Sequence, residues 1–254
     1  EGPYRGNLFT HRVLYNSHLH TSKTFLMLVH ALENPPADFP TFNYTPPAEI
    51  PLAQFQPADA ERDEVAAMLR ESAGANRIIL LNANASDLMP LRRWDNANYI
   101  ALARRLLETF PDIAVAFTGA PAEAAKVEKF ITEIGSERCF SLAGKTTLRQ
   151  LLVVYGLSEI LVTNDSGPAH FAALTPIDVV VLFGPETPEL FGTLSPRNHS
   201  IWLRLACSPC INAWNNRQTA CKNNLCLKNI TVDQVYETVC SIYKNRTAQL
   251  PESF

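Results

Sequence analysis

The stretch TNDSGPAH, residues 163–170, places an acid, a hydroxyl, a glycine and a histidine close together where an apolar run ends. These residue types could form a hydrolase triad, a phosphate cradle, or a strand that turns into a helix. A hydrolase nucleophile at Ser166 is disfavoured because the nucleophile elbow needs a glycine two residues earlier, where Asn164 stands. Asp165 and His170 are also too near in sequence to be taken as a relay, since triads assemble from distant segments.

The turn interpretation assigns a helix that starts within this stretch. We expect Asp165 or Ser166 to cap the helix, with Gly167 easing the turn and Pro168 in the first helical turn. His170 then falls one turn into the helix, where a lone histidine is more often a hydrogen-bond partner than a catalyst. Capping does not exclude contact with a ligand.

Further candidates follow other apolar runs. PLRRW places Arg92 and Arg93 before a helix that starts near Asp95, and either guanidinium could grip a phosphate with its forked geometry. A charged loop with Trp94 packed on the sheet edge explains the same residues equally well. Glu123, after TGAP, is explained by the dipole of the helix that it begins.

The segment AGKTTL resembles a phosphate-binding loop only in part. The Walker pattern needs a second glycine five positions earlier, and that position is Cys139. We therefore expect Lys145 to be a solvated turn residue.

Four of the six cysteines crowd into one loop-rich stretch, with the spacing C-x2-C-x10-C-x4-C. They are Cys207, Cys210, Cys221 and Cys226. Two thiolate pairs could hold zinc tetrahedrally, but this spacing is not that of a zinc ribbon. A local disulfide and reduced packing cysteines remain open, and no metal is the favoured interpretation.

Short apolar runs alternate with amphipathic helical patterns through most of the chain. This alternation predicts parallel strands joined by right-handed crossovers, a doubly wound α/β domain over residues 61–254. Ligands of such domains bind beyond the carboxyl ends of the strands, near helix amino-termini. The expected strands are RIILLN, IAVAF, CFS, EILVTN and VVVLF.

Residues 35–60 are rich in proline, which favours an extended linker. Before it, apolar residues at helical spacing around Phe25–Leu32 predict a helix. Residues 1–34 are expected to be the incomplete tail of another domain, because the chain opens in the middle of a pattern and without Met.

Composition narrows the class of protein. The 254 residues carry a formal net charge of −3, so no global positive field favours a nucleic-acid partner. No apolar run approaches a membrane span, and few cysteines for this length favour a reducing cytoplasm.

The run LVTNDSGPAHFAALTPIDVVVLFGPETPELFGTLSP, followed by CSPC and ITVDQV, closely resembles the carboxyl-terminal domain of family 9 glycosyltransferases, the lipopolysaccharide heptosyltransferases. The resemblance covers residues 77–245. It implies the carboxyl-terminal, Rossmann-like half of a two-domain GT-B enzyme, which binds the nucleotide-sugar donor. The amino-terminal domain of the family binds the acceptor and carries the proposed catalytic Asp.

The family also implies which residues contact the donor. The DSGPAH segment would contact its sugar and diphosphate, Arg92 stands where the family has a phosphate-gripping Lys, and Glu123 would lie near the ribose. The donor-binding residues so predicted are Asp165, Ser166, Gly167, His170, Arg92, Glu123 and Ser86.

The resemblance implies an inverting transfer of a heptose or related sugar from an ADP-linked or similar donor to a lipopolysaccharide core or other lipid-linked glycan. The donor is a substrate, and no cofactor is expected. The catalytic base is not found in this chain and is expected in the amino-terminal part. A nucleotide-sugar epimerase and a non-catalytic binding module are the alternatives. The family implies a cytoplasmic protein attached peripherally to the inner membrane.

Overall fold

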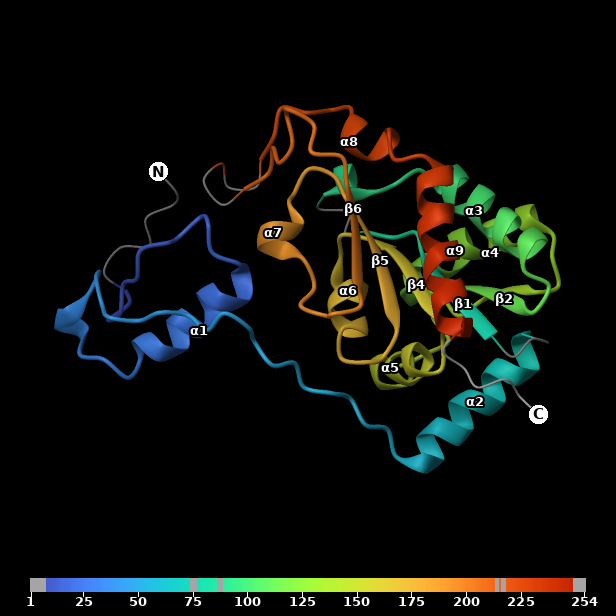
Figure 1. Ribbon diagram of the computed structural model, residues 1–254, viewed down its shortest axis with the longest axis horizontal. Helices are drawn as coiled ribbons and strands as arrows, with labels where there is room; N and C mark the ends of the chain where they lie inside the picture. The colour runs from blue at the N-terminus through green and yellow to red at the C-terminus, as the bar shows by residue number, and fades with distance from the viewer. Residues whose placement is uncertain (1–7, 74–76, 86–88, 213–214, 216–217, 249–254) are drawn as a thin grey trace.

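Six parallel strands form one sheet in the part of the chain that the structure describes, in the order β3-β2-β1-β4-β5-β6 (Figure 1). The structure is a computed structural model that describes residues 8–73, 77–85, 89–212, 215 and 218–248. The strands are β1 (Arg77–Asn82), β2 (Ile113–Phe117), β3 (Cys139–Ser141), β4 (Ile160–Asn164), β5 (Asp178–Phe183) and β6 (Asn198–Trp202). The predicted doubly wound α/β fold is confirmed.

Helices follow the strands because apolar residues recur at helical spacing between polar caps. Asp95 begins α3 by accepting a hydrogen bond from Ala97 N at 3.0 Å, and Thr147 forms a capping box with Gln150 at the start of α5. The helices of this domain are α2 (Asp59–Ala73), α3 (Asn96–Thr109), α4 (Ala124–Ile134), α5 (Leu148–Gly156), α6 (Gly167–Ala172), α7 (Pro188–Phe191), α8 (Leu225–Lys228) and α9 (Val232–Ala248).

Alternate residues of each strand enter two separate cores, one on each face of the sheet. Ile79 and Leu81 of β1 pack with α3, α4 and α9, whereas Ile78 and Leu80 pack with α2, α5 and α6. Both faces are therefore covered, as the continuous apolar runs predicted.

Besides the short helices α7 and α8, one strand and one helix were not predicted from the sequence. The strand β6 reads NHSIW, a polar segment at the sheet edge whose residues are only partly buried or exposed, so it lacks the apolar run of the other strands. The helix α9 was not assigned, although it packs on α3 and on β4 and β5.

The amino-terminal segment lies to one side of the Rossmann-like domain (Figure 1). It contains the predicted helix, α1 (Thr21–Ala31), and the short 3-10 turn η1 (Pro36–Asp38). An extended stretch then leads to α2 and is tied to the domain where Phe55 N donates to Leu174 O at 2.8 Å. Among the described residues, no helix combines the length and the apolar character needed to cross a membrane.

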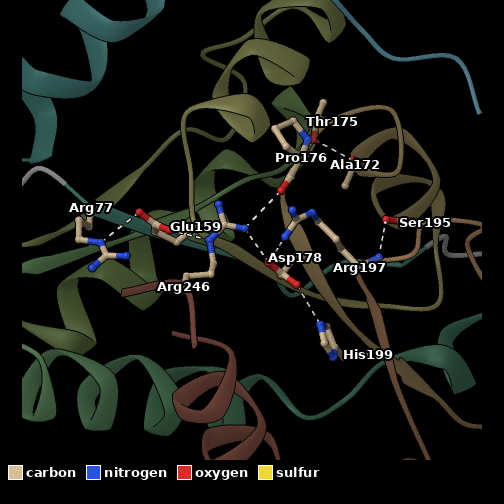
Figure 2. A network of polar contacts seen from close by, with 10 residues as sticks. All are labelled: Arg77, Glu159, Ala172, Thr175, Pro176, Asp178, Ser195, Arg197, His199 and Arg246. Carbon is tan, nitrogen blue, oxygen red and sulfur yellow. Dashed lines mark hydrogen bonds and ion pairs between the residues drawn. The ribbon is translucent and has the colours of Figure 1, made fainter. Parts of the chain in front are cut away.

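Charged side chains gather at the amino ends of the strands (Figure 2). Arg246 of α9 donates to Asp178 Oδ2 at 2.6 Å and to Glu159 Oε2 at 2.8 Å. His199 Nε2 lies 2.9 Å from Asp178 Oδ1, and Arg77 Nε donates to Glu159 Oε1 at 3.0 Å. These contacts fasten α9 to the starts of β1, β4, β5 and β6.

The pKa of Asp178 reports the strength of this network. Burial acts to raise the pKa of Asp178, but the hydrogen bonds from His199 and Arg246 outweigh burial and hold the pKa below its usual value. A carboxylate with a lowered pKa in the folded state stabilises the fold above its unfolded pKa, and this contribution is lost as the pH falls through the lowered value.

Asp178→Asn is expected to lower the free energy of unfolding at pH 7 by about 2–4 kcal/mol, because Arg246 loses a buried anionic partner. Urea denaturation would measure this, and the difference from the wild type should shrink as the pH falls below about 4. Asp233→Asn is the matched control, since Asp233 pairs with Arg105 at a site where its side chain is 71% exposed. Equal losses of unfolding free energy in Asp178→Asn and Asp233→Asn would contradict the stabilising role assigned to Asp178.

Candidate functional site

A cavity of about 800 Å³ lies beyond the carboxyl ends of β1, β2 and β4. The strand order reverses between β1 and β4, and ligands of doubly wound sheets bind at such a reversal. The walls of the cavity come from the turns that follow these three strands and from the start of α5. The side chains used below are those of Asn84, Arg92, Arg93, Glu123, Lys126, Asp165 and Ser166.

The side chain of Asn164, at the end of β4, fixes the turn after β1. Its Oδ1 accepts from Trp94 N at 2.9 Å, and its Nδ2 donates to Asn84 O at 3.2 Å. Trp94 is itself buried, and its indole Nε1 donates to Ile230 O at 2.8 Å. The predicted packing of Trp94 against the sheet is therefore accompanied by two hydrogen bonds that anchor the segment carrying Arg92 and Arg93.

The two arginines have different roles. Arg93 donates from Nε and Nη2 to Ala85 O, so it closes the turn after β1. Arg92 donates from Nη2 to Glu186 Oε1, and its Nε lies 3.6 Å from Asp165 Oδ2. Arg92 is thus paired with two carboxylates beside the cavity.

Asn84 presents an unused hydrogen-bond donor in the cavity wall. It is 7% exposed, and its Nδ2 has no hydrogen-bond partner among the described residues. Its Oδ1 accepts a hydrogen bond from Lys126 Nζ at 3.4 Å. This contact sets the orientation of the amide, and Nδ2 is the amide atom that still lacks a partner among the described residues. A buried amide donor without a partner is costly, and a ligand oxygen would relieve that cost.

Glu123 lies at the neighbouring part of the wall. Its Oε2 accepts from Ala120 N at 2.6 Å, which closes the 3-10 turn η3 (Pro121–Glu123) after β2. A Cβ on Gly119 would lie 3.0 Å from both Asn84 Nδ2 and Glu123 Oε2, so glycine leaves room for both side chains at this part of the wall.

The TNDSGPAH stretch turns from β4 into α6, as predicted. Pro168 occupies the first turn, and Ser166, one of the two expected caps, is the N-cap residue, but its side chain accepts no hydrogen bond from the helix. Its hydroxyl instead donates to Asn164 O at 3.2 Å, since the carbonyl of the strand end lies within its reach.

The structure brings five of the predicted donor-binding residues into the wall of one cavity. These are Arg92, Glu123, Asp165, Ser166 and Gly167. His170 is not part of this wall, and Ser86 lies outside the described residues. The pKa of His170 is lowered, mainly by desolvation from the surrounding protein and further by His20 and Arg92, although the residue is exposed on one side.

The clustered cysteines carry no bond to one another in the structure, and all six cysteines are free. Burial, with smaller contributions from Cys210 and Cys221, raises the pKa of the Cys226 thiol to about 11. Within the described ranges, no group of three or more His, Cys, Asp or Glu side chains is arranged to hold a metal ion.

Lys145 is more than half exposed and lies 3.8 Å from Glu128 Oε1, in agreement with its interpretation as a solvated turn residue.

Sequence reasoning missed Asn84, Lys126 and Glu186. Asn84 follows the first strand in NAN, and Lys126 lies one turn after Glu123, so both positions could have been found from the expected strand ends. Glu186 lies in FGPETPE, at another expected strand end, but its partner Arg92 is 94 residues away and no local pattern reveals the pair.

Asn164→Ala is expected to lower the free energy of unfolding by about 2 kcal/mol, because Trp94 N and Asn84 O lose their buried partner. Chemical denaturation would measure this, with Asn198→Ala as a control on the partly exposed edge strand. A change of no more than a few tenths of a kcal/mol for Asn164→Ala would show that these bonds do not hold the turn.

Comparison with known proteins gives a consistent result. Residues 9–220 match glycosyltransferase family 9 (heptosyltransferase). The lipooligosaccharide heptosyltransferase 2 of Campylobacter jejuni is 29% identical over 176 residues, which cover 66% of this chain and 52% of that protein. The lipopolysaccharide heptosyltransferase 2 of Salmonella typhimurium is 28% identical over 135 residues, covering 52% of this chain and 38% of that protein.

Solved structures agree on the fold. The ADP-heptose lipopolysaccharide heptosyltransferase II of E. coli superposes with a TM-score of 0.68 at 22% identity, over 93% of this chain and 66% of that one. A family 9 glycosyl transferase from Veillonella parvula superposes with a TM-score of 0.66 at 18% identity, over 91% of this chain and 62% of that one. This chain thus spans roughly two fifths to two thirds of the length of these relatives. It belongs to glycosyltransferase family 9, the heptosyltransferase family.

Proposed function

We propose that this chain is the donor-binding part of an inverting glycosyltransferase. The enzyme would move a heptose or related sugar from an ADP-linked or similar nucleotide-sugar donor to a lipopolysaccharide core or another lipid-linked glycan. The observation that carries the proposal is the cavity at the strand-order reversal, with Arg92 and the Asn84 amide in its wall, in a member of family 9. A lipid-linked acceptor makes peripheral attachment to the cytoplasmic face of the inner membrane part of the same proposal.

The cavity suits a ligand of this size and polarity. Its volume of about 800 Å³ lies in the range of small-molecule sites, which are mostly apolar with a few oriented polar groups. The cations in its wall are Arg92, Arg93 and Lys126, and the Asn84 amide adds a neutral donor. These groups complement the oxygens of a diphosphate.

Transfer of the sugar develops negative charge on the leaving diphosphate, and the Arg92 guanidinium is assigned to stabilise that charge. Positive charge develops on the sugar in an oxocarbenium-like transition state, and Asp165 is the carboxylate assigned to it. Arg92 Nε and Asp165 Oδ2 are 3.6 Å apart, so the two groups can act on adjacent atoms of one donor.

The remaining predicted contacts keep their assignments within this proposal. Glu123 uses Oε2 for the turn, and Oε1 is assigned to the ribose hydroxyls. His170, whose pKa is lowered, would offer a neutral imidazole at the side of the amino-terminal segment. Ser166, Gly167 and Ser86 are assigned to the diphosphate. The base that deprotonates the acceptor is assigned to a part of the enzyme that this chain does not span.

ADP is the first nucleotide to test, because the E. coli relative is named for an ADP-heptose donor. Isothermal titration of the wild type with ADP should give saturable binding, and Arg92→Ala should weaken it by about ten-fold or more, as expected for a lost charge-assisted hydrogen bond. Lys145→Ala, which removes an equal charge from an exposed turn, is the control. Absence of saturable binding of ADP and ADP-sugar, with no change in Asp165→Ala, would end the proposal.

Asn84→Asp tests the unused donor without changing the size of the side chain. It replaces the amide Nδ2 with a carboxylate oxygen, which cannot donate and repels a diphosphate, so ADP affinity should fall by about ten-fold. Thermal melting should change little, because Lys126 can still pair with the new carboxylate. Unchanged ADP affinity would show that Asn84 does not contact the nucleotide.

A further inference from the structure

We propose that Glu186 is a positioning residue of this site, which holds the Arg92 guanidinium in the cavity wall and acts on a bound diphosphate only through that arginine. The proposal rests on the proposed function, since it concerns how the donor site is prepared. Glu186 was not among the residues predicted from the sequence or from the family resemblance.

The relative burial of the two side chains supports an indirect role. Glu186 is 2% exposed and is not part of the cavity wall, whereas Arg92 is part of the wall and its side chain is 19% exposed. The carboxylate therefore lies behind the arginine as seen from the cavity. It accepts a hydrogen bond from Nη2, and Nε makes none among the described residues.

Glu186 is held in place through its neighbours on both sides. Pro185 O accepts hydrogen bonds from Cys210 N and Ile211 N, both at 3.0 Å. Thr187 caps α7, with its Oγ1 accepting from Glu189 N at 3.2 Å. A backbone fixed before and after Glu186 restricts where its carboxylate can lie, and a fixed carboxylate can orient a flexible arginine.

This arrangement assigns a role to the cysteine-rich segment that contains Cys207–Cys226. Ser208 Oγ donates to Gly184 O, and a Cβ on Gly184 would lie 2.6 Å from Leu227 Cγ. The segment thus packs directly on the loop that carries Glu186. Its contacts run from the backbone of Cys210 through Pro185 and Glu186 to Arg92.

The second consequence concerns Asp165. Its Oδ2 lies 3.6 Å from Arg92 Nε, and without a competing partner the guanidinium would turn to form a closer pair with it. Such a pair would occupy the group assigned to the diphosphate and the group assigned to the sugar. Glu186 accepts from Nη2 and so limits how closely Arg92 approaches Asp165, whose Oδ2 stays 3.6 Å from Nε.

A double-variant cycle with ADP as the probe tests the proposal. Glu186→Asp, whose carboxylate is one methylene farther from Arg92, should weaken ADP binding by about ten-fold. Glu186→Gln keeps an acceptor oxygen at the same place and should weaken it by no more than about three-fold. In the Arg92→Ala background, Glu186→Asp should cause no further loss, because its effect passes through the arginine.

Thermal melting of each variant separates loss of fold from loss of positioning. Glu189→Gln is the matched control, since it removes a charge three residues along the chain from an exposed pair with Arg204 and should leave ADP affinity unchanged.

The outcomes distinguish two failures. Three results would overturn the role of Glu186 and leave the proposed function intact. They are losses of ADP affinity that multiply in the double variant, equal losses in Glu186→Gln and Glu186→Asp, and no loss in either. A wild-type chain that binds neither ADP nor an ADP-sugar would defeat the proposed function, and the role of Glu186 with it.

Discussion

The side chain of Asn164 is the contact on which the geometry of the site depends. It stands where the strand order reverses and joins the end of β4 to Trp94 N and to Asn84 O. Parallel pairing aligns Asn82 of β1 with Thr163 of β4, so both strands end at the same edge. The pairing sets the two turns side by side, and the amide then fixes the distance between the turn that carries Arg92 and the turn that carries Asp165.

Arg92 stands between two carboxylates whose burial would be unfavourable without it. Glu186 and Asp165 are 2% and 5% exposed, and a buried carboxylate needs a cation and further hydrogen bonds to remain charged. One guanidinium beside two carboxylates leaves a net negative cluster, which by itself would repel a diphosphate. Lys126 and Arg93 also lie in the wall, so the charge that an anion would meet in the cavity depends on these two residues as well as on Arg92.

The fold could be derived from the sequence because the strands β1, β2, β4 and β5 are buried on both faces and read as continuous apolar runs. The edge strand β6 has no such run, and its pairing with β5 depends on tertiary context. For the site, rules on strand ends and the family resemblance located Asp165, Arg92 and Glu123. Neither could reveal that Arg92 contacts Glu186, since a contact between distant turns is set by the packing of the cysteine-rich segment and not by local spacing.

The two edges of the sheet use charge in opposite ways. At the amino edge, Arg246 satisfies both Asp178 and Glu159, and each of these carboxylates has a second cationic or histidine partner. At the carboxyl edge, Asn84 Nδ2 and Arg92 Nε are buried without hydrogen bonds among the described residues. Buried polar atoms without partners reduce stability, so a fold retains them where a ligand supplies the missing contacts. Arg77 Nη2 at the amino edge is a further such atom, so the two edges differ in how their carboxylates are paired and not in whether every buried polar atom has a partner.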